Sequence, residues 1–199
     1  MGTIVDNTAG LLVTQATLVD DALAALRAVV ATAVPTEDPA LSKAVPKIVE
    51  VVKSADDNTT TISAMSLLEL SAYVTPLNFR ITLTSSRHMS SRLLPHAQVL
   101  ITTLLSAAQS ATAVSSQAFT TISAVIEAIP TFVSSKQLNS ILRASIEQRE
   151  ENDVSTKLLT TSAKKVPTKT LFPVVMDLWK DIQNADASVS FSICVDELS

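Results

Sequence analysis

The sequence predicts an all-α fold, and three observations support this class. Apolar residues recur at intervals of three and four along most of the chain, which places them on one face of a helix. Alanine and leucine are abundant, whereas only 2 of the 199 residues are glycine and 4% are aromatic. Prolines stand at the ends of apolar segments, where helices commonly begin or end. With 47% hydrophobic residues, the chain can also bury a sizeable core.

The N-terminal part is predicted to contain four helices. We expect a helix within residues 3–15 and a second one from Thr17 to the step before Pro35. A third helix begins at Asp38, its N-cap, and contains Pro46; a fourth follows Asp57 and ends before Pro76. Residues 77–91 lose the helical period and are assigned to a loop. The predicted apolar stripes are Ala22, Leu26, Val29, Val30 and Ala33; Leu41, Val45, Ile48, Val49 and Val52; and Ile62, Met65, Leu68 and Ala72.

The C-terminal part is predicted to contain further helices of the same kind. Ser134 or Ser135 caps one of them, and Pro173 lies in the first turn of another, in which Trp179 fills a neighbouring groove. Residues 189–195 alternate like a strand but are assigned to the start of a helix. The predicted stripes are Leu93, Ala97, Leu100, Ile101, Leu104 and Leu105; Ala118, Ile122, Val125, Ile126 and Ile129; Leu138, Ile141, Leu142 and Ile146; and Leu171, Val174, Val175, Leu178 and Ile182.

The proline-marked turns recur at similar intervals. Pro35 and Pro76 are 41 residues apart, and Pro130 and Pro167 are 37 apart, close to the forty or so residues of a HEAT-type helix pair. We therefore predict one domain over residues 1–199, a HEAT-repeat α-solenoid of about four stacked antiparallel helix pairs. The expected repeats are 16–54, 56–110, 112–149 and 153–185, and residues 186–199 begin a further repeat.

No catalytic, metal or cofactor site is predicted. Glycines occur only at positions 2 and 10, so there is no glycine-rich phosphate loop. His88 and His96 have no further ligands at suitable spacing, and Cys194 belongs to no motif. The acidic group Glu147, Glu150 and Glu151 reads as a solvated turn. We expect a protein that is not an enzyme.

The net charge of -4 argues against binding nucleic acid along the whole surface. Two basic groups remain as candidate contacts with a partner or with RNA. For lysines at the C-terminus of a helix, attraction to the negative end of the helix dipole is also a sufficient structural explanation. These groups are Lys164, Lys165 and Lys169, and Arg80, Arg87 and Arg92. No run of eighteen apolar residues and no secretory leader are found, which predicts a protein outside membranes.

Two segments carry a resemblance to a known family. Ile129-Pro130-Thr131-Phe132 and Val166-Pro167-Thr168-Lys169-Thr170-Leu171-Phe172-Pro173 resemble inter-helix steps of the U-three small nucleolar RNA-associated protein ten family. This family is a large HEAT-repeat subunit of the small-subunit processome. The resemblance implies a non-catalytic scaffold in the nucleolus of the nucleus that supports transcription and processing of pre-ribosomal RNA. The implied partners are other subunits of the early processome subcomplex and, through basic patches, pre-ribosomal or small nucleolar RNA.

A second hypothesis from another class stays open at this stage. Secreted helical bundles that bind a lipid or another apolar ligand share helices rich in serine, threonine and alanine with few aromatic residues. A central apolar cavity would favour that function, whereas an open stack of helices would favour the scaffold.

Overall fold

The computed structural model describes residues 2–32, 38–73, 93–110, 112–148 and 153–196, and within them all regular structure is helical. The prediction of an all-α protein is confirmed. The basic group Arg80, Arg87 and Arg92 and the loop expected at 77–91 lie outside the described residues. The α-helices are α1 (Gly2–Thr14), α2 (Val19–Thr32), α3 (Asp38–Ser54), α4 (Asn58–Tyr73), α5 (Ala97–Ala107), α6 (Thr112–Ala128), α7 (Ser135–Glu147), α8 (Asp153–Lys165) and α9 (Thr168–Asp196). Short 3-10 helices, η1 (Ala16–Leu18), η4 (Leu94–His96) and η5 (Pro130–Phe132), precede α2, α5 and α7.

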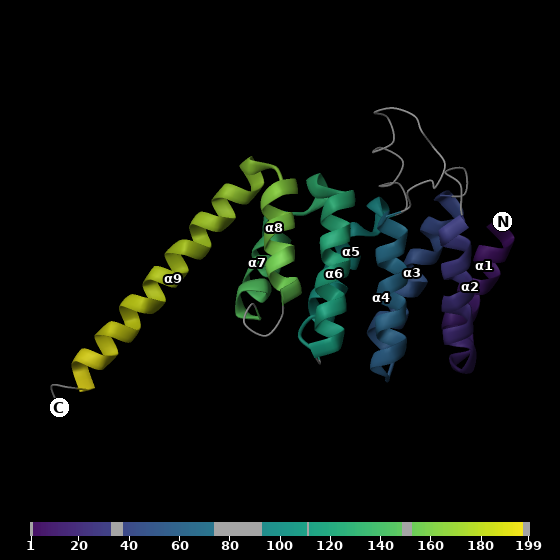
Figure 1. The fold of residues 1–199 in the computed structure, drawn as a ribbon, viewed down its shortest axis with the longest axis horizontal. Coiled ribbons are helices and arrows are strands. Elements are labelled where there is room, and N and C mark those ends of the chain that lie inside the picture. Colours follow the sequence, from purple (N-terminus) through teal and green to yellow (C-terminus); the bar gives the residue numbers. More distant parts are fainter. Residues whose placement is uncertain (1, 33–37, 74–92, 111, 149–152, 197–199) are drawn as a thin grey trace.

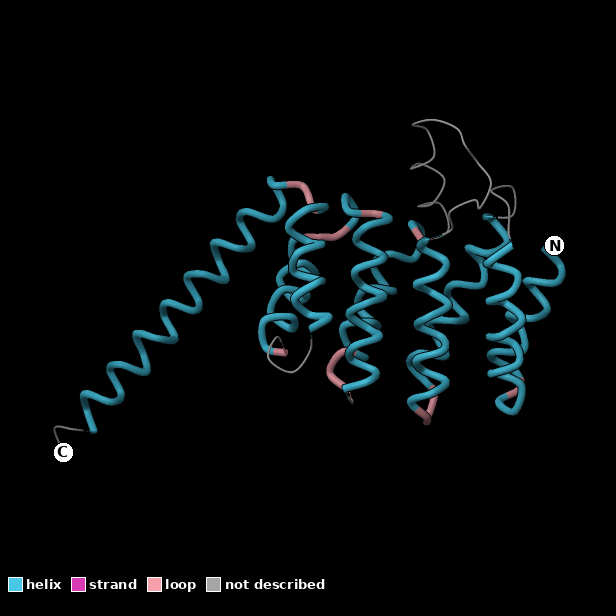
Figure 2. Tube along the Cα trace, viewed as in Figure 1, coloured by secondary structure: helices cyan, strands magenta, loops and turns pink. Residues whose placement is uncertain are grey.

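The helices form a row of hairpin pairs in two layers (Figures 1 and 2). The pairs that pack together are α1 with α2, α3 with α4, α5 with α6, and α7 with α8. Each odd-numbered helix also contacts the next odd-numbered one, and the even-numbered helices from α2 to α8 do the same. The last helix, α9, begins against α7 and then runs away from the row (Figure 1).

The contacts divide the chain differently from the expected repeats. The repeats 16–54, 56–110, 112–149 and 153–185 each place a proline-marked turn inside a helix pair. Pro130 and Pro167 instead lie between one hairpin pair and the next, between α6 and α7 and between α8 and α9. Residues 186–196 are the continuation of α9 and not the beginning of a separate helix. A proline next to the end of a helix carries no information about which neighbour that helix packs against.

Most of the predicted apolar stripes are buried. On α6, which lies between α4 and α8, Phe119, Ile122 and Ile126 are fully buried. Three residues expected to face inward are exposed instead: Ile146, Val175 and Trp179. The prediction that Trp179 fills a groove is therefore wrong, and its position is described below.

Two helix starts show why the chain turns where it does. The Ser134 side chain accepts a hydrogen bond from the backbone of Gln137, whose own side chain accepts from the backbone of Ser134, a reciprocal cap of α7. Asp57 caps α4 by accepting from the Thr60 backbone at 2.9 Å, and hydrogen bonding to Thr60 lowers the pKa of this carboxyl. Helix α9 begins at Thr168, so Pro173 lies beyond the first turn in which it was expected.

Polar contacts join consecutive helices of the even-numbered layer. A hydroxyl or amide of one helix meets a polar group of the next, which favours one register between neighbours because a shifted helix would lose these contacts. The contacts are Thr60 Oγ1 to Asp20 Oδ1 at 2.9 Å, Thr121 Oγ1 to the Met65 carbonyl at 3.3 Å, Gln117 Nε2 to Glu69 Oε2 at 2.8 Å, and Ser123 Oγ to Thr161 Oγ1 at 3.0 Å.

Candidate protein-binding surface

Helix α9 has one face packed against the row. Val174 and Leu178 are buried, Leu171 is partly buried against the core, and α7 is the helix that α9 contacts most. An ion pair between Arg143 of α7 and Asp181 of α9 lies beside this contact. Both charged side chains are about half exposed, so the pair contributes little to stability.

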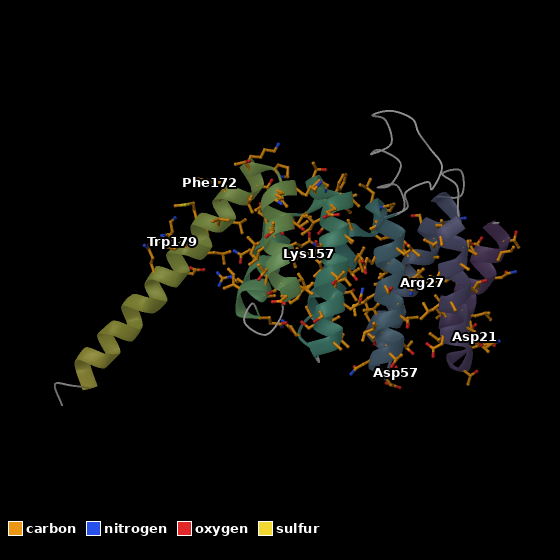
Figure 3. The ribbon with its side chains drawn as sticks, in the orientation of Figure 1. Asp21, Arg27, Asp57, Lys157, Phe172 and Trp179 are labelled. Atoms are coloured by element: carbon orange, nitrogen blue, oxygen red, sulfur yellow. The ribbon has the colours of Figure 1, made fainter. Side chains whose placement is uncertain are left out.

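The adjacent face of α9 carries large apolar side chains that no described part of the chain covers. Phe172, Val175, Met176 and Trp179 are 62%, 45%, 39% and 56% exposed. Their spacing of three, one and three residues places them on one strip along two turns of the helix. We call these four residues the α9 stripe. In Figure 3, the side chains of Phe172 and Trp179 lie on the side of α9 that faces away from the row.

Sequence reasoning missed this surface, although a signal for it is present. The apolar residues of α9 cover two adjacent faces, one containing Val174 and Leu178 and the other containing the α9 stripe. One neighbouring helix covers a single face of this width. An apolar arc wider than one partner can cover therefore predicts a second partner, and α7 accounts for only the first.

The lysines singled out from the sequence lie together at the turn between α8 and α9. Lys164 and Lys165 end α8, and Lys169 lies in the first turn of α9. All three are exposed, and none forms an ion pair within the part of the chain that the structure describes. The dipole of α8 favours the first two at its C-terminal end. Lys169 lies three residues before Phe172, so the cationic group is next to the α9 stripe.

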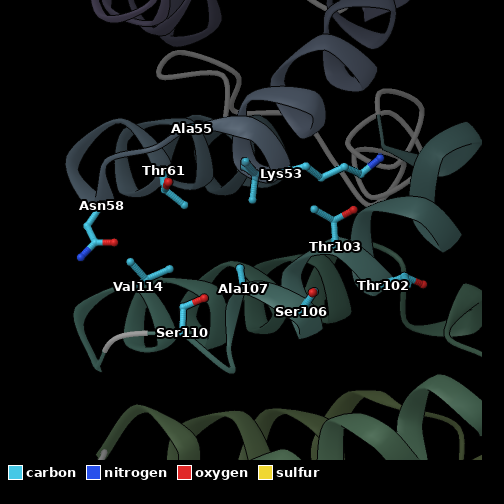
Figure 4. A pocket seen from close by; sticks show the side chains of 11 residues that line it. Lys53, Ala55, Asn58, Thr61, Thr102, Thr103, Ser106, Ala107, Ser110 and Val114 are labelled. Carbon is cyan, nitrogen blue, oxygen red and sulfur yellow. The ribbon is translucent and has the colours of Figure 1, made fainter.

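A pocket of about 490 Å³ lies between the ends of α3, α4, α5 and α6 (Figure 4). Hydroxyl, methyl and amide groups line it together with one amine, that of Lys53. Two of its hydroxyls already donate to backbone carbonyls four residues earlier, Thr61 to Asp57 at 2.9 Å and Thr102 to Gln98 at 2.9 Å. The lining includes no carboxylate, imidazole or thiol.

Within the described ranges, no cluster of three or more histidine, cysteine, aspartate or glutamate side chains could hold a metal ion. The ring of His96 is half-buried, with Nε2 3.4 Å from the Ser42 hydroxyl, which is a contact between α3 and η4. None of the helices described is both long and apolar enough to cross a membrane.

Comparison with known proteins does not place the chain in a group. No protein-family model matches it, and no solved structure gives a significant match.

Proposed function

We propose that this chain is a HEAT-repeat α-solenoid segment that acts as a non-catalytic scaffold for other macromolecules. The observation that carries the proposal is the α9 stripe, a large apolar surface at one end of a row of helices. The two-layer contact pattern supports it, because each helix packs on its partner and on the helix two positions along the chain. Repeat proteins of this architecture use such extended surfaces for binding.

The resemblance of two segments to a known family suggests the complex in which this scaffold acts. The steps at Ile129–Phe132 and Val166–Pro173 resemble those of the processome family named above, so we propose a role in the small-subunit processome of the nucleolus. In that setting the segment supports transcription and processing of pre-ribosomal RNA. Its partners are other subunits of the early subcomplex, with pre-ribosomal or small nucleolar RNA as a local contact at Lys164, Lys165 and Lys169.

The charge distribution favours protein partners over broad RNA contact. The net charge is -4, and the exposed lysines at the α8–α9 turn form a small group, so this surface can neutralise only a few phosphates. An apolar surface of four large side chains on α9 is the kind of site that another protein covers.

The test is retention of defined partners by the tagged chain from nuclear extract, measured by mass spectrometry and RNA sequencing. We expect enrichment of processome subunits and of the pre-ribosomal RNA leader. Changing Lys164, Lys165 and Lys169 together to glutamate should leave the fold intact and reduce RNA retention. The matched control changes Lys43, Lys136 and Lys157 to glutamate, which alters the net charge equally at scattered exposed positions.

Absence of these subunits from the retained proteins would contradict the setting, since the scaffold is proposed to bind them directly. Equal RNA retention by the two triple variants would contradict the lysine contact. Lipid that copurifies with the chain, together with absence of processome subunits, would favour the lipid-binding helical bundle instead.

A further inference from the structure

We infer that the α9 stripe binds an amphipathic helix of a partner protein, with acidic residues along one edge of that helix. This inference rests on the proposed scaffold function and specifies the chemistry of one of its partners. It follows from the shape, the charge and the isolation of the surface.

The shape of the surface suits a helix. Phe172, Val175, Met176 and Trp179 occupy positions i, i+3, i+4 and i+7, the set that one helix presents to another. The other large exposed apolar residues, Ile4, Val13, Val99, Phe132 and Ile146, are spread over α1, α5, η5 and α7. Single exposed residues of that kind are normal on a protein surface, whereas four on one strip form a patch.

The edge of the α9 stripe is basic. Lys169 is three residues from Phe172, and Lys180 is four residues from Met176, so both amines lie along the same side of the strip. Lys180 has a partner in Asp177 at 3.8 Å, but both side chains are about two-thirds exposed, so the pair is weak and open to exchange. Asp181, which is paired with Arg143, lies on the α7 side of the helix.

This charge distribution favours an acidic partner over an antiparallel second copy of the chain. In an antiparallel pairing of two α9 helices through their stripes, the lysine edges of both copies would face each other. Like charges brought together across an interface oppose association. A partner helix with aspartate or glutamate opposite Lys169 and Lys180 gains attraction at the same positions.

The chain contains its own reporter for this contact. Trp179 is its single tryptophan and is more than half exposed, so covering it with an apolar helix should shift its fluorescence emission to shorter wavelength. The probes are two synthetic helical peptides with the same leucine face, one with glutamates and one with lysines along the edges. Titration of the full chain with each peptide gives the two dissociation constants.

We expect the glutamate peptide to shift the emission and to bind at least about tenfold more tightly than the lysine peptide at low salt. Changing Phe172 and Met176 to serine should weaken binding about tenfold or more, with circular dichroism and the unfolding temperature unchanged. Val99→Ser on α5 is the control, because Val99 is similarly exposed but lies outside the stripe. Changing Lys169 and Lys180 to glutamate should reverse the preference between the two peptides.

Three results would overturn the inference. The first is the absence of any emission shift with either peptide. The second is equal binding of both peptides, or binding that the change of Phe172 and Met176 to serine does not weaken. The third is a dimer in light scattering that the Phe172 and Met176 variant abolishes, because a second copy would then occupy the stripe. None of these results bears on whether processome subunits are retained from nuclear extract, so failure of this inference is distinguishable from failure of the scaffold proposal.

Discussion

Helices α6 and α9 are both rich in apolar residues, but they end up in opposite environments. α6 packs against α4, α5 and α8, and its side chains Phe119, Ile122 and Ile126 are fully buried. α9 has α7 as its main neighbour and keeps Phe172 and Trp179 exposed. Burial therefore follows the number of neighbouring helices and not the apolar content of a helix. An apolar helix with one neighbour is the place where such a row can bind something else.

The comparison is sharpest between two residues of the same type. Phe119 on α6 is 0% exposed and Phe172 on α9 is 62% exposed. We expect Phe119→Ala to lower the free energy of unfolding by about 3–5 kcal/mol, because it leaves a cavity in a helix that three neighbours enclose. Phe172→Ala should change it by less than about 0.5 kcal/mol. Urea denaturation of both variants measures this difference, and similar losses would show that α9 is covered in solution.

A substitution on the covered face of α9 should separate local from global stability. Leu178 is buried against the row, so Leu178→Ala should lower the free energy of docking of α9 on α7 by about 2–3 kcal/mol. Because α9 can detach without exposing α6, hydrogen exchange should accelerate in α9 while the amides of α6 keep their protection. Equal acceleration in both helices would mean that the row unfolds as one unit.

A small increase in stability is expected from one substitution on α8, the helix next to α6. Ser162 on α8 is fully buried, and among the residues that the structure describes its hydroxyl has no hydrogen-bond partner. Ser162→Ala removes an unpaired polar group and should raise the free energy of unfolding by about 1 kcal/mol or less. Ser155→Ala on the same helix is the control, because Ser155 is equally buried and does have a partner. Thermal unfolding compares the two, and a loss at position 162 would indicate that this hydroxyl is paired in solution.

Much of the fold could be predicted from the sequence because a helix imposes a pattern on residues that are close together in the chain. The three-four spacing located the buried residues of α3, α5 and α6, and Ser134 was one of the two serines expected to cap α7. Pro130 and Pro167 lie between α-helices, as proline's missing amide predicts, whereas Pro46 and Pro173 lie inside α3 and α9.

The burial of individual residues on α9 and the pairing of helices could not be predicted, because they depend on tertiary contacts that produce no pattern within a short stretch of sequence. Trp179 and Val174 are both apolar residues of α9, and only the position of α7 decides which of the two is buried. The same holds for the grouping of helices into pairs, since the turn at Pro167 could have been inside a pair or between two. Hydroxyl contacts such as Ser123 with Thr161 join residues far apart in the chain and follow no spacing rule.

The pattern of neighbours also bears on how the protein is made. Every substantial contact in the described row joins helices that are adjacent or two apart along the chain. A growing chain can therefore complete each hairpin pair as it leaves the ribosome, at about 5–20 residues per second, without waiting for a distant segment. Each hairpin pair can therefore pack on the pair before it as soon as both have been synthesised, and α9 needs only α7 for its main contact.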